Sequence, residues 1–236
     1  MEDGHPASDQ SETIDLFFWD MRFQGRYGFY FLYGFLTVLY MILLLSLPET
    51  WKTTAASILI FSDPAAMGLF FMGAIVLLEK SQRVTSYFAI SPLRAFEYVL
   101  SKVLSLSLIG VIVAAVLAVT TGCAAFFQVL TGTVLSSVLF TLLGMIIATK
   151  IRSLNQFLIA TVPIELITFV PAILHLAGIT PAIFGIYPAN VCMDLVAGRV
   201  FSWIGLILTV AVIVLLFWAA DRCVWKMWQE QGGVKL

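Results

Sequence analysis

Charge is scarce in this chain of 236 residues. Only 11% of the residues are Asp, Glu, Lys or Arg, whereas 61% are hydrophobic. Soluble domains carry about 25% charged residues, which keep their surface in water. This composition excludes a water-soluble globular protein. The net charge of −1 gives no indication of a nucleic-acid partner, and we expect none.

Motifs of catalytic and metal sites are also missing. The chain has three cysteines and two histidines, and none of them stands in a CxxC or Cys/His spacing. The sequence contains no HExxH, GxSxG or GxxxxGK[ST] motif. We therefore expect no catalytic residue, no metal and no bound cofactor on this chain. Cys123, Cys192 and Cys223 are expected to be free thiols, with a disulfide between the first two as the alternative.

Six apolar runs make up most of what is present. They cover residues 27–47, 54–78, 99–121, 131–149, 157–177 and 202–220. A helix needs roughly 20 apolar residues to cross a bilayer, and continuous runs exclude the alternating strands of a barrel. The sequence predicts one all-α integral membrane domain, residues 1–236, with six transmembrane helices. Residues 27–220 form the bundle, and the first run is expected to stay in the mature protein.

The basic residues predict the orientation, because Lys and Arg gather in short cytosolic loops. With a cytosolic N-terminus, only Lys52 and Arg199 of the 13 basic residues lie outside. The cytosolic set is Arg22, Arg26, Lys80, Arg83, Arg94, Lys102, Lys150, Arg152, Arg222, Lys226 and Lys235. Both termini are then cytosolic, with residues 1–26 and the tail 221–236 on that side.

Two segments outside the runs are predicted to be helical at the membrane surfaces. Ser11 is a candidate N-cap for an amphipathic helix in the inner headgroup region; a cytosolic extension of the first span is the alternative. Its apolar side is Ile14, Phe17, Phe18 and Met21, opposite Asp15, Asp20 and Arg22. Residues 178–201 are apolar but broken by Pro and Gly, which favours short re-entrant helices over an ordinary outer loop. Within them, Asp194 and Arg199 are expected in solvent.

The loop of residues 79–98 is the most informative charged segment, because the chain has hardly any other soluble part. It faces the cytosol in the predicted orientation and is compatible with a short helix at about residues 80–90. Ser91 and Pro92 would begin the next helix, as N-cap and first helical residue. A membrane protein with one well-built cytosolic loop is expected to be contacted there by another protein.

Two carboxylates lie inside apolar runs, Asp63 in the second and Glu165 in the fifth. A charge at the bilayer centre is costly, so both are expected to face the bundle interior or water. They could bind a cation or a basic substrate, relay protons, or be structural. His175 near the end of the fifth run is expected to be a hydrogen-bonding residue rather than a metal ligand.

These features resemble the permease subunit of the ABC-2 type (type V) ATP-binding-cassette exporters over nearly the whole chain. The most specific similarity is Glu79-Lys80 closing the second run, followed by a short helix and a SPL…E…SK pattern. That pattern is Ser91-Pro92-Leu93, Glu97 and Ser101-Lys102. The stretch GIYPANVCMDLVAG, residues 185–198, is similar to the external segment of small permeases for fluoroquinolone-type drug export.

The resemblance implies a bacterial multi-pass cell-membrane protein that is not itself an enzyme. It works as a dimer, with a second copy or a paralogue, and couples to a separate cytosolic ABC ATPase that binds ATP and Mg²⁺. The residues it implies for ATPase coupling are Glu79, Lys80, Arg83, Val84, Tyr87 and Phe88; Asp63 and Glu165 are candidate pathway residues. The rival hypothesis is an ion-gradient-driven secondary transporter that uses Asp63 and Glu165.

Overall fold

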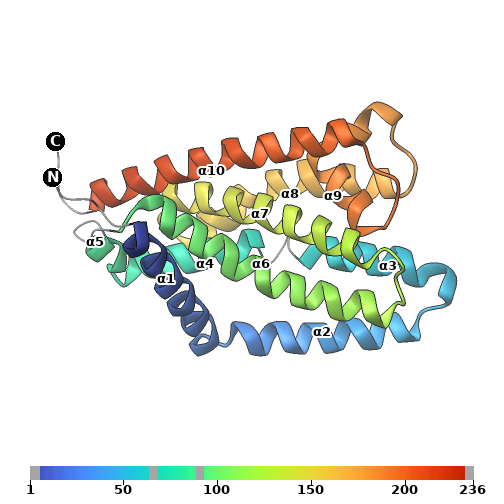
Figure 1. Cartoon of the computed structure of the whole chain (residues 1–236), viewed down its shortest axis with the longest axis horizontal. Coiled ribbons are helices and arrows are strands. Elements are labelled where there is room, and N and C mark those ends of the chain that lie inside the picture. The colour runs from blue at the N-terminus through green and yellow to red at the C-terminus, as the bar shows by residue number, and fades with distance from the viewer. Residues whose placement is uncertain (1–5, 64–67, 89–92, 232–236) are drawn as a thin grey trace.

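The structure is a computed structural model of the whole chain, and it describes residues 6–63, 68–88 and 93–231. Every element in these ranges is a helix, and the helices run largely along one long axis (Figure 1). Their bounds are α1 (Pro6–Arg26), α2 (Phe29–Ser46), α3 (Glu49–Ser62), α4 (Leu69–Ser81), α5 (Val84–Phe88), α6 (Ala95–Thr120), α7 (Phe126–Lys150), α8 (Leu154–Leu176), η2 (Ala182–Ile186), α9 (Pro188–Val196) and α10 (Trp203–Gln231). The predicted all-α fold is confirmed.

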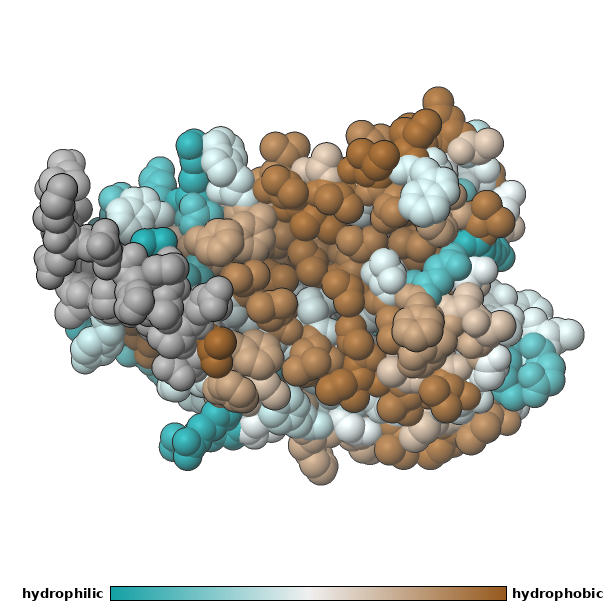
Figure 2. Space-filling view, in the orientation of Figure 1, coloured by the Kyte–Doolittle hydropathy of each residue, from teal (hydrophilic) through white to brown (hydrophobic). Residues whose placement is uncertain are grey.

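Five of the described helices, α2, α6, α7, α8 and α10, are long and apolar enough to cross a membrane. Apolar side chains cover the middle of the face shown in Figure 2, and hydrophilic side chains gather at its two ends. An apolar belt between two polar ends matches the hydrocarbon core and its two water interfaces. The chain is a multi-pass membrane protein.

The second apolar run is helical on both sides of residues 64–67, which lie outside the described residues. Its described parts are α3, which ends at Ser62, and α4, which begins at Leu69, and the backbone of Asp63 and Gly68 is also helical. Figure 1 places α4 toward the end that carries α5, and α3 toward the opposite end. Pro64 lies outside the described residues.

Close helix packing around α7 depends on small residues. α7 packs against α4, α6, α9 and α10. A Cβ added at Gly144 of α7 would lie 2.5 Å from the backbone oxygen of Leu69, and one at Gly132 would lie 2.9 Å from the backbone nitrogen of Val196. Small residues let membrane helices approach closely and gain van der Waals contact. α7 is therefore the central helix against which the others are positioned.

The segment of residues 178–201 contains η2 and α9, and all of α9 from Ala189 to Val196 is buried. α9 packs against α3, α7, α8 and α10. The expectation of a solvent position was wrong for Asp194 but is confirmed for Arg199, which is exposed. Asp194 is 6% exposed and its carboxylate lies 3.0 Å from His175 Nε2, while the Arg199 guanidinium donates to the carbonyl of Leu176. Burial of α9 brings these polar groups against the end of α8.

Two predicted helix starts also shift. α1 begins at Pro6 rather than at Ser11. α6 begins at Ala95, with Arg94 as its N-cap and the Glu97 carboxylate accepting a hydrogen bond from the Arg94 backbone N–H. Pro92 is therefore not its first residue; Ser91 and Pro92 lie outside the described residues. All three cysteines are free.

Candidate coupling site

The candidate site lies at the end of the molecule where α1, α5 and the last turns of α10 come together (Figure 1). α5 is a short helix that packs against α4 and α10. Arg83, between α4 and α5, has a φ of 58°, in the left-handed region that side chains other than Gly rarely adopt. This turn separates α5 from α4 and presents Tyr87, which is 69% exposed.

The residues predicted for ATPase coupling do not share one environment. Arg83 and Tyr87 are exposed and Val84 is half-buried, while the side chain of Phe88 lies outside the described residues. Glu79 is fully buried and cannot touch a partner protein in this conformation. The exposed surface of this segment therefore consists mainly of the Arg83–Tyr87 turn and helix.

Glu79 belongs to a buried ionic cluster. The ammonium of Lys102 lies 2.7 Å from Glu79 Oε1 and 2.7 Å from Asp20 Oδ1. All three side chains are almost entirely buried, and they come from α4, α6 and α1. Removing one partner of a buried ion pair strongly destabilises the protein, because the remaining charge is buried without its counterion. The cluster ties three helices together at one point.

Neutral polar groups complete the cluster. The hydroxyl of Tyr98 donates to Glu79 Oε2 at 2.5 Å, and the hydroxyl of Ser101 donates to Asp20 Oδ2 at 2.5 Å. One turn further along α6, Ser105 accepts a hydrogen bond of 2.9 Å from the Gln24 side-chain amide. Each carboxylate thus has an ion pair on one oxygen and a hydroxyl on the other, as buried charges require. We name Asp20, Glu79, Tyr98, Ser101 and Lys102 the inner polar cluster.

Sequence patterning gave Asp20 the wrong environment. It places Asp20 on the polar side of an amphipathic helix, yet Asp20 is buried against α6, while Ile14 and Phe18 are largely exposed. Periodicity tells which residues share a side of a helix but not which side faces the protein. The sequence feature that could have predicted the burial of Asp20 is Lys102. Its ammonium lies at the edge of an apolar run and needs a carboxylate partner.

Lys80 connects α4 to α7. Its ammonium donates to the carbonyls of Ala148, Thr149 and Ile151, at 2.6, 2.8 and 3.0 Å. A cation that caps the last carbonyls of a helix also interacts favourably with the helix dipole. Lys80 therefore fixes α4 against the end of α7.

The two candidate pathway carboxylates lie in different environments. Asp63 at the end of α3 is 3% exposed, and neither of its oxygens has a hydrogen-bond partner among the described residues. Glu165 in α8 is half-buried and lines a cavity of about 330 Å³ together with Ser62, Thr168 and Phe169. Ser62 is the chain neighbour of Asp63, so both carboxylates belong to the same region of the bundle. Among the described residues no cluster of three metal-ligating side chains occurs.

Comparison with known proteins decides the family. Residues 12–228 match the fluoroquinolones export permease protein family. The chain belongs to this family. The permease is 28% identical over 165 residues to fluoroquinolones export permease proteins from two strains of Mycobacterium tuberculosis, and the match covers 69% of each chain. No solved structure gives a significant match to the permease.

This result confirms the resemblance to the small fluoroquinolone-export permeases. The matched range begins within α1 and ends within α10, so it contains the whole inner polar cluster and α5. The protein is thus a membrane transport subunit, and its relatives are bacterial. Since it is a permease, the exposed α5 segment and the buried cluster beneath it are interpreted as parts of a transport cycle.

Proposed function

We propose that this permease is the membrane subunit of an ATP-driven exporter of the ABC-2 type. It crosses the membrane six times, with α3 and α4 together forming the second crossing and both termini in the cytosol. Two permease chains, identical or paralogous, enclose the pathway. A separate cytosolic ABC ATPase binds ATP and Mg²⁺ and docks on α5.

One observation carries this proposal: the exposed α5 segment joins directly to α4, and α4 is held to the rest of the bundle by ion pairs and hydrogen bonds. α4 leads from α5 to Glu79, and the inner polar cluster links Glu79 to Lys102 of α6 and Asp20 of α1. Lys80 links the same turn of α4 to α7. A displacement of α5 by a partner is therefore transmitted to α1, α6 and α7 together, rather than lost in a flexible loop.

The orientation and the partner follow from charge. Eleven of the 13 basic residues fall on the α5 side in the six-span arrangement, which makes that side cytosolic. The cytosol is where ATP is available to a partner ATPase, and the sequence itself has no P-loop motif. ATP-driven closure of two ATPase subunits would push α5 and tilt the attached helices, so that access changes from the inside to the outside.

The relatives are named for fluoroquinolone export, and we propose a planar, amine-bearing drug of this type as the substrate. Asp63 and Glu165 are the carboxylates inside the described apolar helices that could attract its ammonium group. The second candidate function is export driven by an ion gradient, with Asp63 and Glu165 carrying the coupling ion. The carboxylate of Asp63, which has no hydrogen-bond partner within the described ranges, favours keeping this candidate.

The docking proposal is tested by changing only the exposed surface of the α5 segment. The double variant Arg83→Glu/Tyr87→Ala is expected to reduce co-purification of the ATPase about tenfold or more, because a few exposed aromatic and arginine residues dominate most interfaces. The measurement is the ratio of ATPase to tagged permease after solubilisation from native membranes. Thermal stability should stay within about 0.5 kcal/mol, as for other surface changes.

A matched control is Trp51→Ala, which removes an exposed aromatic residue near the opposite end of the molecule. This variant should retain the ATPase at the wild-type ratio. Equal recovery of the ATPase by the double variant and the control would sink the assignment of α5 as the docking element. Loss of the ATPase from both variants would mean that assembly is sensitive to any change, and would equally remove support for α5.

A further inference from the structure

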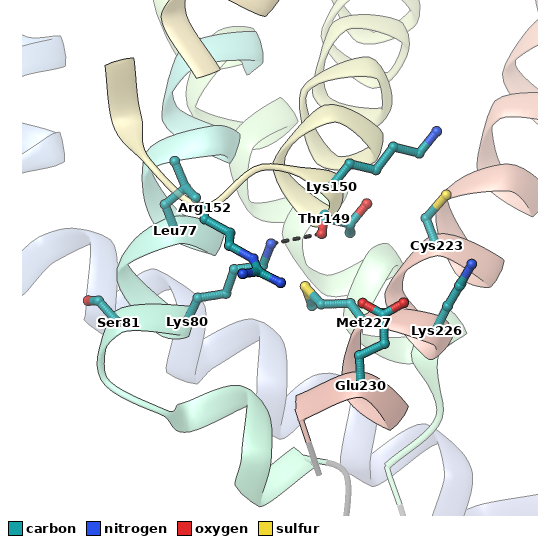
Figure 3. Close-up of a pocket in the computed structure, with 10 residues that line it drawn as sticks. All are labelled: Leu77, Lys80, Ser81, Thr149, Lys150, Arg152, Cys223, Lys226, Met227 and Glu230. Carbon is teal, nitrogen blue, oxygen red and sulfur yellow. Dashed lines mark hydrogen bonds between the residues drawn. The ribbon is translucent and has the colours of Figure 1, made fainter. Parts of the chain in front are cut away.

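A basic pocket lies beside the candidate coupling site and shares Lys80 with it. It has a volume of about 690 Å³ and is enclosed by the end of α4, the turn between α7 and α8, and the last turns of α10. Lys80 and Arg152 line one side, and Lys226 and Glu230 line the other (Figure 3). Lys150 at the end of α7 completes its charged lining.

The charges of this pocket do not balance. Four cations and one carboxylate, Glu230, line the pocket, which leaves a formal charge of +3. Lys80 is held by the carbonyls at the end of α7. The other three cations, Lys150, Arg152 and Lys226, are exposed and form no ion pair within the described ranges. Three donors at the mouth of one pocket are thus free to bind an anion.

Lys80 and Arg152 place two positive charges on the same side of the pocket. Positive charges held close together repel one another, and an anion bound between them would relieve that repulsion. The pocket is therefore charged in a way that favours an anionic ligand.

The position of the pocket relative to the membrane indicates which kind of anion it could bind. Lys226 follows the apolar run that ends at Ala220 by six residues, or about 9 Å at the rise of an α-helix. That distance corresponds to the headgroup layer and its boundary with water. Trp225 is half-exposed nearby, and the Arg222 guanidinium stacks on Trp218 at 3.7 Å. Trp residues with adjacent basic side chains are typical of the membrane interface.

We propose that this pocket binds the phosphate group of an anionic phospholipid headgroup from the cytosolic leaflet. Basic pockets between membrane helices at this depth suit such headgroups, and Leu77 and Met227 give the pocket an apolar wall beside the cations. The assignment to the cytosolic leaflet rests on the proposed function. The ability of the pocket to bind a phosphate group does not depend on it. A bound headgroup would join Lys150 and Arg152 to Lys226, and so hold the α7–α8 turn against α10.

The test is lipid binding to the purified full-length permease in detergent, without any ATPase. Native mass spectrometry would compare dioleoylphosphatidylglycerol with dioleoylphosphatidylcholine for the wild type and for Arg152→Gln/Lys226→Gln. Each cation near a membrane surface contributes about fivefold to the binding of an anionic lipid. The double variant should therefore bind the phosphatidylglycerol roughly 25-fold more weakly, with the phosphatidylcholine unchanged. Lys80 is left intact because it caps α7.

The matched control is Arg22→Gln/Lys52→Gln, which removes two exposed or partly exposed cations outside the pocket and should keep the wild-type lipid preference. Inorganic phosphate and glycerol 3-phosphate separate the two sources of the anion: displacement of the lipid by either at millimolar concentration assigns the site to a soluble phosphate. Equal binding of both lipids by the wild type would overturn the proposal. So would a double variant that keeps the lipid preference of the wild type, since the cations of the pocket would then not be what binds the headgroup.

Discussion

Replacement of Lys102 by Met is expected to lower the free energy of unfolding by about 3–5 kcal/mol, the cost of removing one partner from a buried ion pair. The two carboxylates of Asp20 and Glu79 would be left facing each other with no counterion, and both are almost fully buried. Thermal unfolding of the purified permease in detergent measures the change. Transport should be lost as well, because α1 and α6 separate from α4.

The control compares the same substitution in an exposed pair. Lys52 pairs with Glu49 at 2.6 Å, but the Glu49 side chain is 85% exposed, so Lys52→Met should cost less than about 1 kcal/mol. A second variant, Lys102→Met with Asp20→Asn and Glu79→Gln, removes all three charges together and should recover much of the lost stability. Equal stability of Lys102→Met and wild type would contradict the role given to the inner polar cluster.

Replacement of Asp63 by Asn is expected to reduce transport about tenfold or more while raising thermal stability. A charged carboxylate near the bilayer centre costs about 2.5–3.5 kcal/mol, and Asp63 has no hydrogen-bond partner among the described residues to offset this cost. When a residue is needed for function but lowers stability, replacing it is expected to reduce activity and raise stability together. Glu165→Gln should also reduce transport of an amine-bearing substrate, but with little change in stability, because Glu165 is half-buried beside a cavity.

The measurements are uptake into inside-out vesicles and thermal unfolding of each variant. Glu49→Gln is the matched control, since it makes the same change from carboxylate to amide at an exposed position, and it should behave as the wild type in both assays. Wild-type transport by both Asp63→Asn and Glu165→Gln would mean that these carboxylates are structural. In that case the candidate pathway would have to be sought elsewhere in the bundle.

Hydropathy predicted the helices well, because each described apolar segment folds as a helix. It did not predict the contacts between helices, which depend on tertiary packing. The pairing of Asp20 with Lys102 joins positions 82 residues apart, and a single sequence contains no local signal for such a pair.

The candidate site was predicted in location but not in detail. The sequence indicated the charged loop after the second run, and the structure places an exposed short helix there. The family resemblance implied Glu79 and Lys80 for ATPase coupling; the structure shows that Glu79 is buried in the inner polar cluster and that Lys80 caps α7. Local charge could not reveal this, because the same Glu-Lys pair suits either a solvent-exposed turn or a buried ionic contact.

The most direct test of the central claim is the energy source of transport. Inside-out membrane vesicles that contain the permease and its ATPase would be loaded with a fluoroquinolone in the presence of ATP, with and without a protonophore. Our account predicts uptake that requires ATP, persists when the proton gradient is collapsed, and is lost in Arg83→Glu/Tyr87→Ala. Uptake that proceeds without ATP and disappears with the protonophore would contradict it, and would establish a gradient-driven exporter that uses Asp63 and Glu165.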